Sequence, residues 1–259
     1  MRAVTFRSVT YDIAVSWQMV TVVAVFFMAT LVRSTFGFGE ALIAVPLLAF
    51  ILPVEVAAPV AVLVSITVAA VIVAGDWRHV HLRSAGRLVL STLFGLPIGL
   101  LALRSVPESI VKLLLGLLVA GFSTWSLLRA HARELKDDRH AWVFGWLAGV
   151  LGGAYGMNGP PLAVYGVLRR WPPAQFRATL QSYFLPASIL GLIGYWIAGL
   201  WTPAVTRYYQ LSLPAVTVAI VLSRWVNRQI DGARFLIYVH AFLVGVGLTL
   251  VAQSIVSLA

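Results

Sequence analysis

Arg33 and Glu40 stand seven positions apart in the stretch 15–52, which is otherwise uncharged. Ionisable groups inside a long apolar stretch are costly to bury and usually serve binding, proton transfer or gating. Each residue allows two interpretations. Glu40 either pairs with Arg33 for structural reasons or carries a proton or controls a gate, and Arg33 either coordinates an anionic ligand or pairs internally.

Helix-breaking residues lie beside this pair and again in the second half of the chain. Gly37 and Gly39 separate the two charges, and Gly156, Asn158 and Gly159 precede two prolines. Where a helix is interrupted inside a membrane, its unpaired backbone groups must face protein, water or a ligand. A half-helix that begins at the break points its N–H groups and its positive dipole end toward it. Two such ends at mid-membrane would form an anion site.

The predicted site combines both breaks with the polar residues around them. Gln181 and Ser182 open the apolar stretch that follows the second break, although interhelical hydrogen bonding would explain them equally well. Ser65, in the corresponding stretch of the first half, is a weaker candidate. The residues predicted to bind the ligand are Arg33, Ser34, Thr35, Gly37, Gly39, Gly156, Asn158, Gly159, Gln181 and Ser182, with Glu40 as the coupling or gating group.

The two breaks belong to an internal duplication. Their sequences align at an offset of 119 residues, which also matches positions well beyond the glycines. Paired glycine or proline interruptions in the two halves of an apolar chain are typical of transporter binding sites. The matched pairs are Gly37 and Gly156, Ala44 and Ala163, Val45 and Val164, Pro53 and Pro172, Gly75 and Gly194, and Trp77 and Trp196.

The composition indicates a polytopic membrane protein. Of 259 residues, 60% are hydrophobic and 11% are charged, and the mean hydropathy is +0.92. That leaves too little polar surface for a water-soluble globule, and several apolar runs approach the ~20 residues that cross a bilayer as a helix. The net charge of +10 comes from bases in short loops between these runs, so it indicates control of topology rather than nucleic-acid binding.

The positions of the basic residues favour an inverted arrangement. Eight single crossings would divide them almost evenly, whereas a hairpin at each glycine motif places 13 of the 19 on one face, the predicted cytoplasmic side. The predicted fold is all-α, with two inverted-topology repeats, each a broken or hairpin helix plus three transmembrane helices. The repeats cover residues 1–128 and 141–259, residues 129–140 form a cytoplasmic linker, and both termini are periplasmic. The apolar run near the N-terminus is expected to be a retained helix rather than a signal peptide.

Signatures of catalysis are missing from the sequence. No Gly-Lys-Ser/Thr, His-Glu-x-x-His or Gly-x-Ser-x-Gly motif occurs. The sequence also has no cysteine, which excludes disulfides and iron–sulfur clusters. We therefore predict that the protein is not an enzyme and needs neither a metal nor another cofactor.

The two motifs resemble those of the TauE/SafE family of sulfite and organosulfonate exporters. They are Gly-Phe-Gly-Glu-Ala-Leu-Ile-Ala-Val-Pro at residues 37–46 and Gly-Met-Asn-Gly-Pro-Pro-Leu-Ala-Val-Tyr at residues 156–165. The likeness extends over nearly the whole chain, but the first motif departs from the usual glycine-rich run by carrying Glu40.

The resemblance implies outward transport of small sulfur-containing anions, such as sulfite or sulfoacetate, across the bacterial inner membrane. The expected partners are this anion and the lipid bilayer, with no nucleic acid, and a homodimer would be compatible. The expected mechanism is alternating access by a secondary transporter. The alternative is an anion channel or a membrane-embedded assembly protein without a transport cycle.

Overall fold

The computed structural model describes residues 2–76, 82–128, 135, 137–229 and 232–258. Nearly all of them are helical, and no strand occurs in these ranges, so the all-α prediction is confirmed. Much of the predicted linker 129–140 lies outside the described residues. In chain order the helices are α1 (Arg2–Phe36), α2 (Glu40–Leu48), α3 (Val54–Asp76), α4 (Leu82–Ser105), α5 (Glu108–Leu128), α6 (Ala141–Tyr155), α7 (Gly159–Leu168), α8 (Pro173–Ile197), α9 (Pro203–Gln229) and α10 (Gly232–Leu258).

Seven of these helices are long and apolar enough to cross a membrane: α1, α3, α4, α5, α8, α9 and α10. The most apolar segment, Val54–Ala74, has 21 residues and a mean hydropathy of 2.7. At ~1.5 Å per residue it spans about 31 Å, which matches the hydrocarbon thickness of a bilayer. The helices α6 and α7, with 15 and 10 residues, are too short to cross singly. The protein is therefore a multi-pass membrane protein.

Both predicted helix interruptions are present. Gly37 and Gly39, between α1 and α2, have φ angles of 91° and 104°, and Gly156, at the end of α6, has φ 63°. Side chains disfavour this left-handed region, so glycine permits the chain to leave one helix and begin the next within three residues. Asn158 is the N-cap residue of α7, and Pro160 follows where a missing backbone N–H is tolerated.

The first break differs from the second in the length of the helix before it. α1 has 35 residues, and its segment Trp17–Phe36 could cross a bilayer by itself, whereas the hairpin interpretation predicts a shorter helix. The physical reason is local. No glycine or proline occurs before Gly37, so nothing in the sequence ends this helix earlier.

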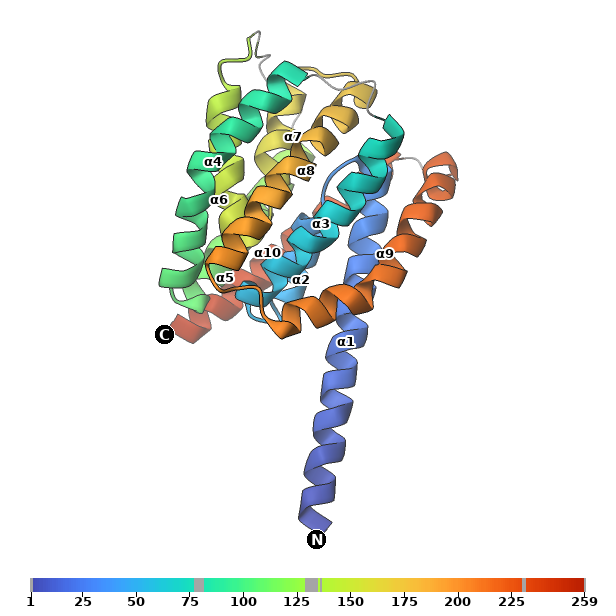
Figure 1. The fold of residues 1–259 in the computed structure, drawn as a ribbon, viewed down its shortest axis with the longest axis vertical. Coiled ribbons are helices and arrows are strands. Elements are labelled where there is room, and N and C mark those ends of the chain that lie inside the picture. The colour runs from blue at the N-terminus through green and yellow to red at the C-terminus, as the bar shows by residue number, and fades with distance from the viewer. Residues whose placement is uncertain (1, 77–81, 129–134, 136, 230–231, 259) are drawn as a thin grey trace.

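Helices from the two halves of the sequence pack against one another rather than forming separate cores. The most extensive contacts join α4 to α6, α5 to α10, α1 to α9, and α3 to α8. One buried apolar cluster unites parts of α1, α2, α3, α5, α9 and α10, and another joins α6, α7 and α8 with residues of α3 and α4. In Figure 1 the α1–α2 and α6–α7 segments approach the centre from opposite ends of the molecule.

The α4–α6 contact is made by glycines. A methyl group on Gly95 or Gly99 would overlap the backbone of α6, and one on Gly149 or Gly153 would overlap that of α4. The two backbones therefore lie in direct contact, as in other small-residue helix pairs of membrane proteins. The α1–α9 pair contains no glycine in either helix.

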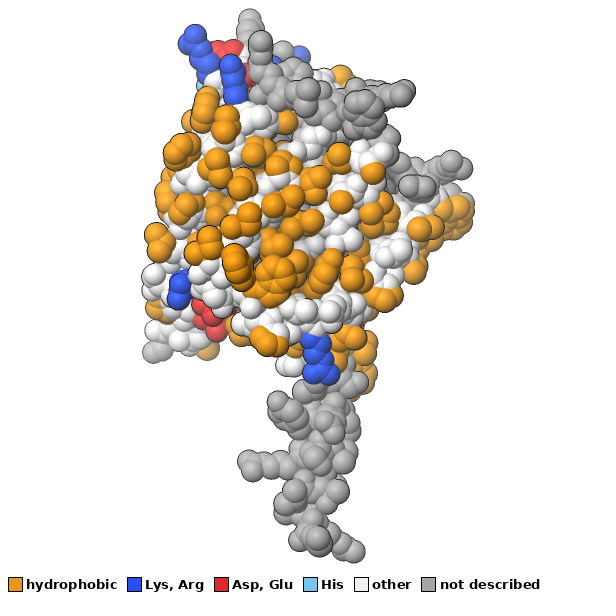
Figure 2. Space-filling view, viewed as in Figure 1, with side chains coloured by type: hydrophobic (Ala, Val, Ile, Leu, Met, Phe, Trp, Pro, Cys, Tyr) orange, Lys and Arg blue, Asp and Glu red, His pale blue; other side chains and the backbone are white. Residues whose placement is uncertain are grey.

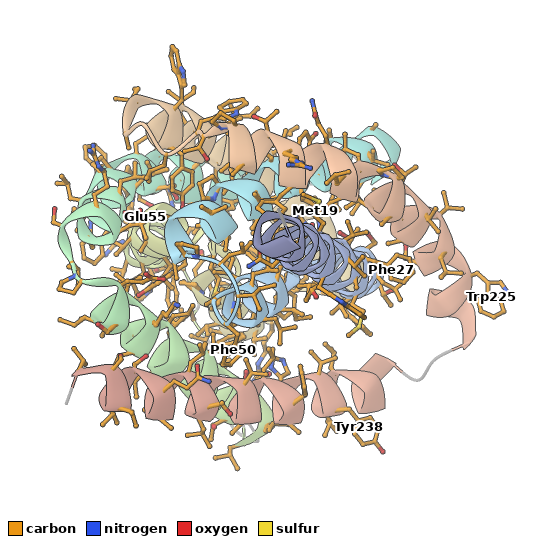
Figure 3. The ribbon with its side chains drawn as sticks, turned by 90° about the horizontal axis from the view of Figure 1, so that it is seen from below. Met19, Phe27, Phe50, Glu55, Trp225 and Tyr238 are labelled. Atoms are coloured by element: carbon orange, nitrogen blue, oxygen red, sulfur yellow. The ribbon has the colours of Figure 1, made fainter. Side chains whose placement is uncertain are left out.

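The outer surface is apolar over the region between the two ends. Hydrophobic side chains cover the middle of the face in Figure 2, whereas Lys and Arg side chains lie toward its upper and lower ends. Trp225 of α9 and Tyr238 of α10 point away from the bundle (Figure 3), with 58% and 71% of their surface exposed. Such large exposed apolar areas suit contact with lipid rather than with water.

Candidate functional site

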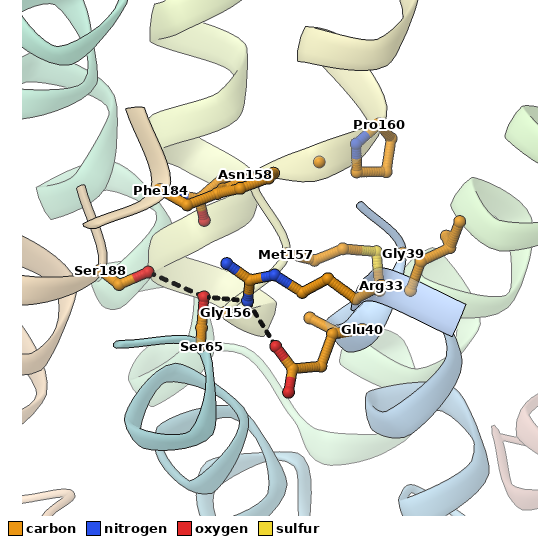
Figure 4. A pocket seen from close by; sticks show the side chains of 13 residues that line it. Arg33, Gly39, Glu40, Ser65, Gly156, Met157, Asn158, Pro160, Phe184 and Ser188 are labelled. Carbon is orange, nitrogen blue, oxygen red and sulfur yellow. Dashed lines mark hydrogen bonds and ion pairs between the residues drawn. The ribbon is translucent and has the colours of Figure 1, made fainter. Parts of the chain in front are cut away.

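The two helix interruptions meet at one buried pocket. The first turn of α2 and the turn between α6 and α7 form two of its walls, and residues of α1, α3 and α8 complete it (Figure 4). The cavity volume is about 20 Å³, which is room for about one water molecule. The lining residues are Arg33, Gly39, Glu40, Ala41, Leu42, Ser65, Gly156, Met157, Asn158, Gly159, Pro160, Phe184 and Ser188.

A buried ion pair between Arg33 and Glu40 dominates this pocket. Both residues are only 2% exposed, and the Nη1 of Arg33 donates a hydrogen bond to the Oε2 of Glu40. Thr30, one turn earlier in α1, donates to the other carboxylate oxygen at 3.1 Å. Breaking a buried pair by removing one partner is strongly destabilising, because the other charge stays buried and uncompensated.

Arg33 also contacts two other helices. Its Nη1 donates to the Oγ of Ser65 on α3 at 2.7 Å, and its Nη2 donates to the Oε1 of Gln181 on α8 at 3.1 Å. The guanidinium carbon lies 4.8 Å from the ring centroid of Phe184, a cation–π distance. The Oγ of Ser65 lies 3.1 Å from that of Ser188, so this network links α3 to α8 (Figure 4). The Nε of Arg33 is buried, and no described residue accepts a hydrogen bond from it.

The turn between α1 and α2 positions the pair. The N–H of Gly37 closes α1 by bonding to the carbonyl of Arg33 at 2.6 Å. The chain then reverses through Gly39, the N-cap of α2, so that Glu40 returns toward α1. The Nε2 of Gln181 donates to the carbonyl oxygen of Gly37 at 2.7 Å, which satisfies a backbone acceptor at the break.

The second break has no charged side chain and is held by hydroxyl groups. The Nδ2 of Asn158 donates to the phenol oxygen of Tyr183 at 3.4 Å, and that oxygen lies 2.6 Å from the Oγ1 of Thr92 on α4. The phenol of Tyr195 donates to the carbonyl oxygens of Gly152 and Gly153 at 2.9 and 3.0 Å. α8 thus satisfies the polar groups at the end of α6.

The two half-helices do not offer equal numbers of donors to the pocket. In the first turn of α2, Glu40, Ala41 and Leu42 all carry backbone N–H groups. The first turn of α7 contains Pro160 and Pro161, which have none, so Gly159 alone supplies an N–H there. The side-chain amide of Asn158 adds donors on this side of the pocket.

Most of the predicted ligand-binding residues lie in or beside the pocket. Gln181 and Gly37 lie outside the lining but belong to the Arg33 network. The predicted residues that line the pocket are Arg33, Gly39, Glu40, Gly156, Asn158 and Gly159.

Three predicted residues, Ser34, Thr35 and Ser182, are not among those that line the pocket. Thr35 donates instead to the carbonyl of Leu31 in its own helix at 2.8 Å. The reason is the helical repeat of 3.6 residues per turn, which turns the immediate neighbours of Arg33 and Gln181 away from the face on which those two lie.

Two residues that line the pocket, Phe184 and Ser188, are absent from the predicted set, and a third, Ser65, is in the prediction only a weaker candidate. Phe184 and Ser188 follow Gln181 by three and seven positions, so all three share one face of α8. This spacing can be read from the sequence alone, and it indicates that Phe184 and Ser188 face the same side as Gln181. No comparable spacing marks Ser65, which reaches the site only through the packing of α3 against α8.

Comparisons with known proteins agree with the motifs. Residues 22–250 match the model of the family described as sulfite exporter TauE/SafE. The chain is 26% identical over 226 residues to a protein of Cupriavidus necator named probable sulfite/organosulfonate exporter TauE, covering 85% of this chain and 88% of that relative. No solved structure matches. Because the family model spans most of the sequence, including both breaks and the pocket between them, the chain belongs to the TauE/SafE family.

Proposed function

We propose that this protein is a secondary transporter that exports small sulfur-containing anions, such as sulfite or organosulfonates including sulfoacetate, across the bacterial inner membrane. The observation that carries the proposal is the buried guanidinium of Arg33 at the point where two helix interruptions meet, in a chain of the TauE/SafE family. A buried ionisable group at such a break is expected to serve the substrate.

The donors around the pocket suit a sulfonate or sulfite group. The planar guanidinium group of Arg33 can donate two parallel hydrogen bonds to two oxygens of an oxyanion, a bidentate contact that suits arginine better than lysine. The N-terminal turn of α2 contributes N–H groups and its dipole, and Asn158 supplies an amide from the opposite wall. Ser65 and Ser188 provide hydroxyl groups on a third side.

The packing pattern supports two inverted repeats, residues 1–128 and 141–259. In this arrangement α1 to α5 correspond in order to α6 to α10, so the short helices α2 and α7 are equivalent. The contact between α4 and α6 then corresponds to the contact between α9 and α1, and the contact between α3 and α9 corresponds to that between α8 and α4. The α5–α10, α3–α8 and α2–α7 contacts join equivalent helices. Together with the opposite approach of the two broken segments in Figure 1, this pattern supports a pseudo-two-fold relation. Such repeats usually underlie alternating access.

The asymmetry of glycine packing supports a division into a rigid part and a mobile part. The backbones of α4 and α6 are in direct contact through five glycines, whereas α1 and α9 have none. We therefore place the movement of the cycle in α1 and α2, which carry Arg33 and Glu40, relative to the α4–α6 pair. The small cavity then corresponds to a state that has no room for the substrate.

The driving forces across the inner membrane set the direction of transport. The basic loops would face the cytoplasm and both termini the periplasm. Export runs down the gradient of the accumulated anion, and the membrane potential adds ~2.3 kcal/mol per 100 mV for each net negative charge that leaves.

Flux measurements in proteoliposomes test the proposal. We expect uptake of labelled sulfoacetate that saturates with concentration, accelerates when unlabelled sulfite is present on the opposite side, and is lost in Arg33→Met. Current that rises linearly with voltage and concentration, without saturation or exchange, would indicate a channel. Absence of any anion movement by folded protein would instead favour an assembly protein.

A further inference from the structure

The anion site as the structure presents it is already occupied by a carboxylate of the protein. Both terminal nitrogens of Arg33 are engaged, Nη1 by Glu40 and Ser65 and Nη2 by Gln181. The cavity beside them accommodates no more than about one water molecule. If Arg33 binds the substrate, as the proposed function requires, the anion must take the place of the Glu40 carboxylate.

The charges in the pocket balance before the anion arrives. Arg33 and Glu40 are the charged members of its described lining, so the pocket is neutral as a unit. An added anion would leave one negative charge uncompensated beside two side chains that are almost fully buried. Such a charge is strongly disfavoured unless a partner or a proton neutralises it.

The helices packed around Glu40 offer little else to compensate that charge. Thr30 on α1, Ser65 on α3, Gln181 on α8 and Asn158 before α7 are uncharged. The phenol hydroxyl of Tyr183 is engaged by Thr92 and Asn158.

Among the described residues, α5 and α10 also contact α2. On α5, Lys112 pairs with Glu108 at 3.0 Å, and both are partly exposed. On α10, the ring of His240 packs against Phe122, with ring centroids 5.7 Å apart. Glu40 is therefore the group placed to take up the proton.

We propose that the anion and one proton bind together: the anion replaces Glu40 on Arg33, and the released carboxylate takes up one proton that comes as hydronium from the bulk solution on the side from which the anion enters. Thr30 can continue to donate its hydrogen bond to the carbonyl oxygen of the protonated carboxyl group. When the anion leaves, Glu40 loses the proton and pairs with Arg33 again. One proton thus crosses with each anion, so a monovalent sulfonate moves without net charge and a divalent anion moves with one negative charge.

The test uses methanesulfonate as the probe, because this anion keeps a single charge over the whole pH range of interest. Isothermal titration calorimetry of the purified full-length protein, repeated in buffers of different ionisation enthalpy, measures how many protons are taken up on binding. We expect uptake of about one proton per anion, and an affinity that falls about tenfold per pH unit over at least part of the range between about pH 5 and pH 8. Binding without proton uptake, at an affinity independent of pH, would overturn the coupling while leaving the proposed function intact.

A pair of variants separates coupling from a structural role of the carboxylate. Glu40→Gln removes the competing charge, so it should bind methanesulfonate at least tenfold more tightly than the wild type near neutral pH, without proton uptake. Glu55→Gln makes the same change at an exposed position on α3 outside this pocket and should behave like the wild type. Weaker binding of methanesulfonate by Glu40→Gln than by the wild type would contradict the proposal that the anion and the Glu40 carboxylate compete for Arg33. If Glu40→Gln does not fold, calorimetry of the wild type still shows whether a proton is taken up with the anion. Failure of the wild type to bind the probe at any pH would count against the proposed function itself.

Discussion

Gln181 of α8 donates a 2.7 Å hydrogen bond to the carbonyl oxygen of Gly37, which lies 144 positions earlier in the chain. The same side chain accepts a hydrogen bond from Arg33, so one amide holds both the broken backbone and the buried charge. This contact connects the second half of the sequence to the break in the first.

Gln181→Leu should weaken both stability and anion binding. The substitution leaves the Gly37 carbonyl and one Arg33 N–H without partners in a buried site, at a cost of about 1–3 kcal/mol for each orphaned group. Thermal unfolding in detergent and methanesulfonate titration measure the two effects. Gln253→Leu, at an exposed position of α10, is the matched control and should change neither.

Arg33→Lys should impair anion binding even though it keeps the positive charge. Lysine cannot present two parallel N–H groups, so the bidentate contact with the anion is lost. We expect the affinity for methanesulfonate to fall at least tenfold, while Arg104→Lys, at an exposed position near the end of α4, leaves it unchanged. Equal affinities in Arg33→Lys and the wild type would place the substrate elsewhere.

Asn158→Leu should abolish binding without unfolding the protein, because leucine fills a similar volume but offers no donor. The matched comparison is Tyr183→Phe. This variant removes the hydroxyl group to which Asn158 donates but leaves the Asn158 amide in the pocket. We expect a smaller loss of affinity in Tyr183→Phe. Transport by Asn158→Leu at the wild-type rate would remove this residue from the site.

Gly149→Ala should destabilise the protein by about 1–3 kcal/mol, the usual cost of overpacking a tight contact. The added methyl group would overlap the backbone of α4 at Thr92. Gly245→Ala, in α10, meets open space and should be neutral or stabilising by up to about 1 kcal/mol, because alanine favours helix more than glycine does. Equal melting temperatures for both variants would contradict the close α4–α6 contact.

The predicted orientation can be tested with single cysteines, because the natural chain has none. Ser105→Cys is placed at the last residue of α4, and Asp137→Cys lies before α6; both positions are exposed. A maleimide that cannot cross membranes should label the first variant in intact cells and the second only after the inner membrane is permeabilised. The reverse pattern would place the termini in the cytoplasm.

The sequence predicts those parts of the structure that depend on local chemistry. The glycines at both breaks and the paired prolines at the second predict where the helices are interrupted, because glycine readily adopts the positive φ angles found there and proline favours the start of a helix. The proximity of Arg33 and Glu40 also follows from a reversal at Gly37 and Gly39.

What the sequence does not predict depends on how distant helices pack. Nothing local indicates that α3 brings Ser65 to Arg33, or that α1 packs against α9. The sequence predicts Ser34 and Thr35 as ligand-binding residues together with Arg33, because adjacent polar residues cannot be assigned to a helix face until the neighbouring helices are known.

The spacing of the ion pair has a consequence for biogenesis. During synthesis α1 leaves the ribosome long before α9, against which it packs in the finished protein. Arg33 would then enter the bilayer before its partner Gln181 has been translated. Glu40 follows only seven residues later, so Arg33 can enter the membrane with its counter-charge already synthesised.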